Sequence, residues 1–341
     1  MEKKGNRSAN MRNDTEYMYA SARIRAAEGK DTAKVRLERM LECRTVEQLL
    51  RFVLDTGFLA EDRQPPADLK TALDMALEDS VSLVRSAVPD PAVYDLFLYK
   101  YDCNNIKTAV KAGILGLDYS GLYYRCGTFS PDGLQERLAA GDTEGLPCHM
   151  ADAVAAANSA YAETGEGRAI DFCLDKACYA DMTAAAEATG TDLFREYTAA
   201  KADSTNILSS VRLADRGTRE AAAAIFEQAF VPGGTLPMTL FLENGCLGYE
   251  ALREVLPDGM LKETVDRILS VGEAARPERI FDDAVNRLMN KNHFQPFGIH
   301  VPAVFLVNRE AEIKNCRILA AGLTAGLSGN ELRERIRVEY V

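Results

Sequence analysis

The chain has 341 residues, 47% of them hydrophobic, which is enough material for two or three domain cores. Its formal net charge of −11 argues against the broad basic surface that binds nucleic acid, although this charge does not exclude local basic patches. No stretch reaches the roughly 20 apolar residues of a membrane-spanning helix, the nearest being 318–327, so no direct membrane span is expected.

The first residues, MEKKGNRSANMRN, are polar and basic and lack the apolar run of a secretion signal. They predict a disordered leader over 1–13. The eight cysteines are scattered and form no C-x-x-C pair. This usage predicts reduced thiols in a cytosolic protein, most of them buried as small hydrophobic residues.

Beyond the leader the composition favours helices, because Ala, Leu, Glu, Arg and Lys dominate and β-branched alternation is nearly absent. Predicted helix starts are the capping boxes Asn13-x-x-Glu16, Thr45-x-x-Gln48 and Ser328-x-x-Glu331, the pair Ser130-Pro131, and Pro302. Predicted helix ends are Gly113, Gly116 and Gly322. The predicted fold class is therefore all-α.

At three places about one domain's length apart, an acidic residue stands three positions before an asparagine. The pairs are Asp102 with Asn105, Asp203 with Asn206, and Glu312 with Asn315. The acids are 101 and 109 positions apart. Because residues i and i+3 share one face of a helix, each acid should lie beside its asparagine.

A second pattern, [Leu/Phe]-Asp-x-Ala, precedes these acids by 28, 28 and 30 positions, with its aspartates at Asp74, Asp175 and Asp282. Two patterns in step through three copies predict a triplicated unit, and the period exceeds the roughly 20–50 residues of a solenoid repeat. The prediction is three similar helical bundles with a pseudo-threefold repeat, over 14–120, 121–220 and 221–341.

The three acid and asparagine pairs have two possible structural roles. Each acid and asparagine could satisfy backbone groups or a neighbouring helix inside its own bundle, as buried polar groups generally do. Alternatively, the three pairs could face a common axis or partner. Neither reading gives the pairs a catalytic role.

Catalytic and cofactor motifs are missing from the sequence. No G-x-x-x-x-G-K-[ST] loop and no G-x-G-x-x-G follow a strand pattern, and His149, His293 and His300 lack metal-ligand spacing. Cys148 and His149 are adjacent, so on a helix their side chains would point apart. We therefore expect a protein that is not an enzyme and holds no cofactor or metal.

Two alternatives belong to other functional classes. The segment 282–286 reads D-D-x-x-N, similar to the magnesium-diphosphate site of all-α terpenoid synthases, in which carboxylates one turn apart hold the metal. A second metal-binding helix with the pattern N-D-x-x-S-x-x-x-E is missing, and the chain has no tryptophan. The other alternative is a generic helical adaptor.

Several segments carry a family resemblance: YMYASARIRAAE, YDCNNIKTAVKA, KADSTNILSSVRL and the ending PAVFLVNREAEIKNCRILAAGLTAGLSGNELRERIRVEYV. In this order, from Tyr17 to Val341, they resemble the C subunit of the V-type and A-type rotary ATPases, known as the d subunit in eukaryotic enzymes. The departures are Cys316, where the family usually has an aliphatic residue, and the polar leader before Met11.

The resemblance implies a non-catalytic central-stalk component of the rotor. Three similar helical domains would surround a funnel with a central cavity, which sits on the membrane proteolipid ring and receives the foot of the rotor axle. The protein would lie in the cytoplasm, peripheral to the membrane, and link ATP turnover to ion transport. The charged residues Arg333, Glu334, Arg335 and Arg337 are candidates for partner contacts or for a solvated face.

Overall fold

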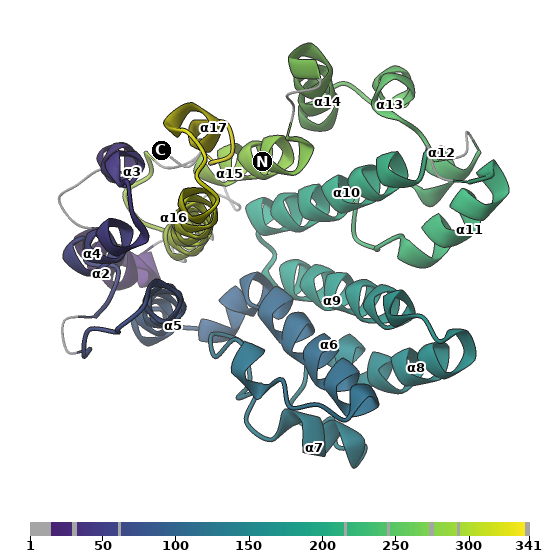
Figure 1. The fold of residues 1–341 in the computed structure, drawn as a ribbon, viewed down its shortest axis with the longest axis horizontal. Coiled ribbons are helices and arrows are strands. Elements are labelled where there is room, and N and C mark those ends of the chain that lie inside the picture. Colours follow the sequence, from purple (N-terminus) through teal and green to yellow (C-terminus); the bar gives the residue numbers. More distant parts are fainter. Residues whose placement is uncertain are drawn as a thin grey trace, which may run out of the picture. The chain divides into compact units, whose positions relative to one another are not determined.

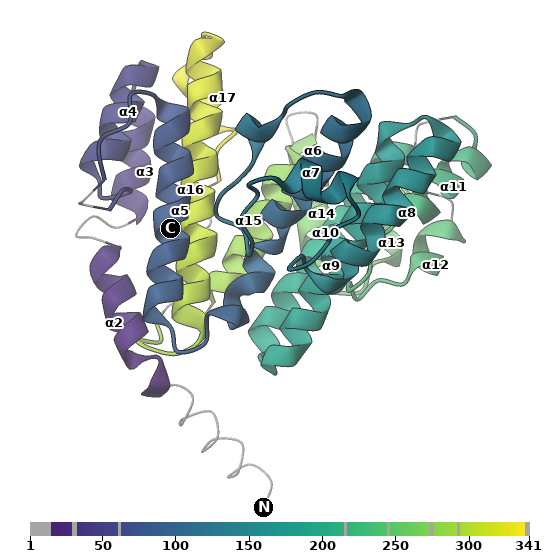
Figure 2. The ribbon, with the colours of Figure 1, turned by 90° about the horizontal axis from the view of Figure 1, so that it is seen from below.

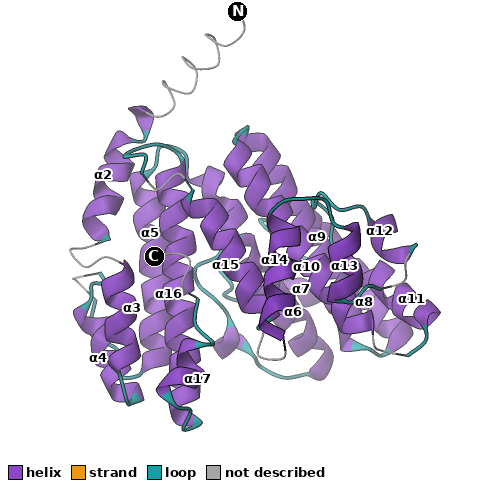
Figure 3. Ribbon diagram, turned by 90° about the horizontal axis from the view of Figure 1, so that it is seen from above, coloured by secondary structure: helices purple, strands orange, loops and turns teal. Residues whose placement is uncertain are grey.

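The structure is a computed structural model that describes residues 15–28, 33–60, 63–214, 217–243, 246–272, 276–291 and 294–337. Throughout these ranges the regular structure is helical and no strand occurs, which confirms the all-α prediction (Figure 3). The chain forms two compact units. Unit 1 comprises 1–92 and 282–341, and unit 2 comprises 93–281.

Unit 1 is built around two long helices, α5 (Leu69–Ala87) and α16 (His300–Thr324), which pack along each other (Figure 2). The first turns of α16 are buried on all sides, from Val301 to Val307, as expected for a central helix. The surrounding helices are α2 (Met18–Ala27), α3 (Ala33–Glu42), α4 (Val46–Asp55), α17 (Gly329–Arg333) and most of α15 (Pro277–Asn290).

Unit 2 is centred on α9 (Gly167–Thr189), which packs against α6, α8, α10 and α11 (Figure 1). Its helices are α6 (Tyr99–Leu115), α7 (Leu134–Ala139), α8 (Cys148–Thr164), α10 (Asp192–Ala214), α11 (Arg219–Ala229), α12 (Met238–Leu242), α13 (Tyr249–Val255) and α14 (Met260–Val271). Short 3-10 helices precede and follow α6, at Pro91–Phe97 and Ser120–Leu122. Aromatic side chains fill the core, as where Phe194 contacts the rings of Tyr94 and Phe97.

Several predicted helix boundaries are confirmed. Ser328 and Glu331 form the full capping box of α17, and the Thr45 side chain accepts a hydrogen bond from the Gln48 amide at the start of α4. Gly116 ends α6 in the left-handed conformation, with a φ of 64°. The helix start predicted at Pro302 is two residues late, because α16 begins at His300 and Pro302 is the third residue of its first turn.

Other predicted boundaries are wrong. The first turn of α7 begins at Leu134 after Gly133, so Ser130 does not cap a helix. Gly113 and Gly322 lie inside α6 and α16 rather than at their ends. Gly322 serves close packing instead, because a Cβ there would lie 2.2 Å from a methyl carbon of Leu332. The capping box at Asn13 and the leader 1–13 fall outside the described residues.

Two helices that carry an acid and asparagine pair each pack against a helix that carries a [Leu/Phe]-Asp-x-Ala pattern. The helix of the third acid and asparagine, α16, packs on α5, which carries the first [Leu/Phe]-Asp-x-Ala pattern. In the same way α6, with the first acid, packs on α9, with the second pattern. The division into 14–120, 121–220 and 221–341, the threefold repeat and the funnel remain predictions.

Candidate functional site

The first acid and asparagine clamp a segment that returns over α6. Asp102 and Asn105 are fully buried. The Asn105 amide donates from Nδ2 to the Tyr124 carbonyl at 2.7 Å, and its Oδ1 accepts from the Tyr124 N–H at 2.8 Å. The Asp102 carboxylate accepts from the Thr128 N–H at 2.9 Å and from its hydroxyl at 2.7 Å. One helix face therefore fixes both ends of the segment 124–128.

The second pair repeats this arrangement on α10. Asn206 exchanges two hydrogen bonds of 2.9 Å with the backbone of Val231. Asp203 accepts from the Thr235 N–H at 2.9 Å and from its hydroxyl at 2.7 Å, and also from the Leu236 N–H at 3.0 Å. In both copies the threonine lies four residues after the residue held by the asparagine.

A glycine precedes each of these threonines, and the backbone there approaches the carboxylate closely. A Cβ at Gly127 would lie 2.0 Å from Oδ1 of Asp102, and a Cβ at Gly234 would lie 2.1 Å from Oδ1 of Asp203. Real Cβ atoms do not approach an oxygen this closely. Glycine is therefore required at both positions for the carboxylate to reach the backbone.

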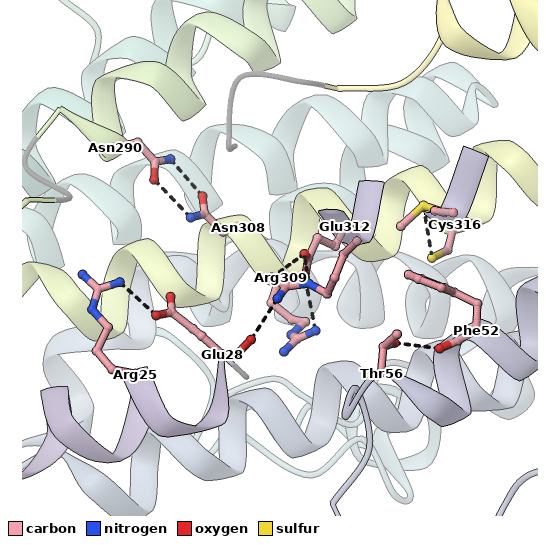
Figure 4. Close-up of polar contacts among 11 residues, drawn as sticks. Arg25, Glu28, Phe52, Thr56, Asn290, Asn308, Arg309, Glu312 and Cys316 are labelled. Atoms are coloured by element: carbon pink, nitrogen blue, oxygen red, sulfur yellow. Dashed lines mark hydrogen bonds and ion pairs between the residues drawn. The ribbon is translucent and has the colours of Figure 1, made fainter. Parts of the chain in front are cut away.

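The third pair keeps the asparagine clamp but changes the partners of the acid. Asn315 exchanges two hydrogen bonds of 2.8 Å with the backbone of Arg337. Glu312 instead accepts from Arg36 Nε at 2.7 Å and from Arg309 at 3.1 Å, with all three side chains buried (Figure 4). Arginine side chains here replace the glycine-threonine segment of the other copies.

Arg309 is the more enclosed of the two arginines. Its guanidinium lies 4.3 Å from the ring centre of Phe58 and 5.5 Å from that of Phe305. Burial lowers its pKa, because desolvation penalises the charged form, and the nearby Glu312 opposes that change. On the same helix, Asn308 forms a reciprocal amide pair with Asn290, with distances of 2.9 and 3.1 Å (Figure 4).

The aspartates of the [Leu/Phe]-Asp-x-Ala pattern bind cations on helices that carry the acids. Asp74 pairs with Arg317 at 2.7 Å, and Asp175 pairs with Lys107 at 2.6 Å. Each of these cations stands five positions after its helix's acid, Glu312 or Asp102. These ion pairs join α5 to α16 and α9 to α6.

Asp282 has two cationic partners, Lys314 at 2.6 Å and Arg337 at 2.9 Å. Arg337 is therefore a buried structural residue, and its interpretation as an exposed partner contact is wrong. Arg333, Glu334 and Arg335 are exposed. Because its carboxylate is neutralised by these side chains, Asp282 is a poor magnesium ligand, which counts against the diphosphate-enzyme alternative.

Of the three histidines, His149 has a structural partner on the neighbouring helix α9. His149 Nδ1 lies 2.7 Å from Oδ1 of Asp181, which also accepts the backbone N–H groups of His149 and Met150 at the start of α8. Asp181 on α9 thus caps α8. His300 is buried and His293 is outside the described residues. Within the described ranges no cluster of three or more His, Cys, Asp or Glu side chains could hold a metal ion.

The cysteines match their prediction in part. All eight are free thiols, and five are buried. Burial raises the pKa of the Cys316 thiol well above its usual range, so that thiol stays protonated and unreactive. Cys148 is exposed at the first position of α8.

An open pocket of about 930 Å³ lies in unit 2, between the end of α6 and α7. Its charged lining consists of Asp118, Arg125, Asp132 and Glu136, and Arg125 is already paired with Asp132 at 3.0 Å. None of the repeated acids or asparagines lines it. Among the helices of the described ranges, none combines the length and apolar character needed to cross a bilayer.

Comparison with known proteins relates nearly the whole chain to the C subunits of A-type ATP synthases and of a V-type sodium ATPase. It is 24% identical to the C subunit of the A-type ATP synthase of Methanocaldococcus jannaschii, over 93% of this chain and 85% of the relative. It is 26% identical to the C subunit of the A-type ATP synthase of Haloquadratum walsbyi, over 93% and 96%. It is 23% identical to the C subunit of the V-type sodium ATPase of Enterococcus hirae, over 95% and 99%.

The family model of the ATP synthase (C/AC39) subunit matches residues 20–335. This range includes all three acid and asparagine pairs and all three [Leu/Phe]-Asp-x-Ala aspartates. The resemblance noted in the sequence is confirmed: the chain belongs to the ATP synthase (C/AC39) subunit family, to which the C subunits of V-type and A-type ATPases belong.

Proposed function

We propose that this protein is a non-catalytic central-stalk subunit of a V/A-type ATPase, which couples the rotor axle to the membrane proteolipid ring. The observation that carries the proposal is the family match over residues 20–335, together with relatives named as the C subunits of A-type ATP synthases and of a V-type sodium ATPase. In this role the chain lies on the cytoplasmic face of the membrane, held there by the complex.

The clamps described above suit a part that transmits force. Asn105 and Asn206 each bind both backbone groups of a residue in a connection between helices, and Asn315 binds those of Arg337 in the segment after α17, through part-buried bonds at Asn105 and buried bonds at the other two. Packed helical interiors compress little and therefore pass strain from one end to the other. A part that couples two others requires this stiffness.

The proposal of a non-catalytic role is supported by the hydrogen-bond partners of the three buried acids. Asp102 and Asp203 are occupied by backbone and threonine donors, and Glu312 is occupied by two arginines. An acid or base in catalysis must reach a substrate proton directly or through one water. These carboxylates are committed to holding the fold together.

Affinity purification of the full-length tagged chain from solubilised native membranes tests the assignment. The expected result is recovery of the catalytic-head subunits, the axle subunits and the proteolipid, with none of them in a parallel purification from an untagged strain. Recovery of other proteins without any ATPase component would favour the helical-adaptor alternative. A magnesium titration of the purified chain separates the diphosphate-enzyme alternative, since the coupling role predicts no saturable binding.

A further inference from the structure

Two buried thiols meet where α6 packs against α9. Cys103 on α6 is 3% exposed and Cys178 on α9 is 4% exposed. The Cys103 sulfur lies 3.5 Å from the carbonyl oxygen of Leu174. In a regular helix that carbonyl also accepts the N–H of the residue four positions later, which is Cys178. The Cys103 sulfur therefore lies against the helical turn that ends at Cys178.

The register of the two helices gives the same placement independently. Lys107 pairs with Asp175 at 2.6 Å, and Lys111 pairs with Asp171 at 2.6 Å, so α6 and α9 run antiparallel side by side (Figure 1). Cys103 stands one turn before Lys107 on the same face of α6. Continuing the register, Cys103 faces the turn of α9 that follows Asp175.

Cys178 is the thiol in that turn. The hydrogen bond with Cys103, together with burial, raises the pKa of Cys178 well above its usual range. This direction agrees with direct contact between the two thiols. Cys178 therefore stays protonated at neutral pH, as a thiol held against the sulfur of Cys103.

Cys103 is the thiol of the pair with a path to solvent. Its sulfur lies 3.9 Å from Oδ1 of Asp175, and the Asp175 side chain is 42% exposed. One partly exposed side chain thus separates Cys103 from water. A small oxidant that reaches the Asp175 carboxylate is close to the Cys103 sulfur.

We propose that Cys103 and Cys178 are a modification site, at which a peroxide converts the two thiols into a reversible disulfide between α6 and α9. First, the Cys103 sulfur attacks one peroxide oxygen, so that an S–O bond forms and the O–O bond breaks. The released hydroxide takes the Cys103 proton and becomes water. The product on Cys103 is a sulfenic acid.

The second step closes the disulfide. The Cys178 sulfur attacks the Cys103 sulfur, an S–S bond forms, the S–O bond breaks, and the hydroxide leaves as water with the Cys178 proton. The two thiols lose two electrons in total, and one hydrogen peroxide is reduced to two waters. A dithiol reductant reverses the change by thiol–disulfide exchange. Both cysteines lie in unit 2, and the site does not depend on the coupling role.

Two other cysteines show what distinguishes this pair. Cys316 is equally buried, but its sulfur lies 3.7 Å from the thioether sulfur of Met40, which has no proton to lose and forms no disulfide. Cys148 is exposed at the start of α8. It therefore reports whether a given dose of peroxide has reacted with an accessible thiol.

The test treats the full-length folded protein with hydrogen peroxide, blocks the remaining thiols with N-ethylmaleimide and digests the protein with trypsin without reductant. Trypsin separates the relevant cysteines, with Cys103 in the peptide 101–107, Cys173 in 169–176 and Cys178 in 177–195. Mass spectrometry should find 101–107 joined to 177–195, two hydrogen atoms lighter than the separate peptides. Dithiothreitol should release them.

Serine variants identify the partner. Cys178→Ser should lose the joined peptides, and Cys173→Ser is the matched control on the same helix and should keep them. The wild-type peptide map decides the proposal even where a variant fails to fold.

The proposal would be overturned if 101–107 and 177–195 were both recovered as blocked thiols at a peroxide dose that oxidises Cys148. It would also be overturned if Cys103 were joined to a different cysteine, or if the joined peptides formed only in protein unfolded by urea. None of these results would alter the proposed function.

Discussion

Asn105 and Tyr124 exchange two hydrogen bonds, of 2.7 and 2.8 Å, so one side-chain amide satisfies both backbone groups of a residue 19 positions away. The neighbouring Asp102 binds the segment again four residues later, at Thr128. A segment without regular structure is thereby fixed to α6 at two points. On α10, Asn206 and Asp203 bind the segment 231–235 with the same arrangement of hydrogen bonds, so the arrangement occurs twice in unit 2.

Replacing Asn105 by leucine should lower the free energy of unfolding by about 1–3 kcal/mol, because the part-buried N–H and carbonyl of Tyr124 lose their partner. Asn104→Leu is the matched control, since Asn104 is the exposed neighbour on the same helix and should change stability by less than about 0.5 kcal/mol. Urea unfolding measures both. Equal stability of the two variants would show that the amide does not hold the segment.

Adding a methyl group at Gly234 should destabilise the protein by about 1–3 kcal/mol, because the new Cβ would force the Asp203 carboxylate from its donors. Gly113→Ala should do the opposite. That glycine lies inside α6 with open space around it, so alanine should stabilise the helix by about 1 kcal/mol. Thermal unfolding should shift in opposite directions, and a shift in the same direction would contradict the account of these glycines.

Glu312→Gln removes the one carboxylate between Arg36 and Arg309 while keeping its shape. Breaking a buried ion pair in this way should cost about 3–5 kcal/mol, because the buried arginines lose their nearest counter-charge. Glu334→Gln, an exposed substitution in unit 1, is the control and should change little. Chemical denaturation distinguishes them. A stable Glu312→Gln protein would mean that this cluster contributes little to the fold.

Burial, with a contribution from Asp95, raises the pKa of Tyr99 to about 12. A tyrosine in the unfolded chain has a pKa of about 10. Between these values the unfolded chain releases the proton while the folded chain keeps it, so stability falls as pH rises. Tyr99→Phe should therefore lose less stability than the wild type between about pH 10 and 12. Urea unfolding at each pH measures this, and a parallel loss in both proteins would contradict the assignment.

Helix content and the sharing of one helix face by each acid and asparagine could be predicted, because helix propensity and i,i+3 spacing are local properties. The partners of these residues could not. The Gly-Thr pairs that meet Asp102 and Asp203 begin 25 and 31 positions later, at Gly127 and Gly234, and this difference in loop length hides the correspondence. Comparing the segments YRCGT and VPGGT is the signal that would have revealed it.

The third copy was harder still to anticipate. Glu312 is satisfied by Arg36, which is 276 positions away, and no local pattern links two residues at that separation. The wrong boundaries have a related cause. Gly322 resembles a helix end in the sequence, but it is small because Leu332 packs against α16 at that point. At Glu312 and Gly322, contacts with residues distant in the sequence determine the structure, and a local sequence pattern does not contain them.

The coupling role is tested most directly in membranes prepared without this chain, by assaying ATP hydrolysis and ATP-driven ion transport in parallel. The catalytic head holds its own nucleotide sites in the proposed function, so hydrolysis should continue. Transport should be lost, because the ring no longer turns with the axle, and adding back the purified full-length chain should restore it. Transport at the wild-type rate in membranes that lack the chain would contradict the coupling role.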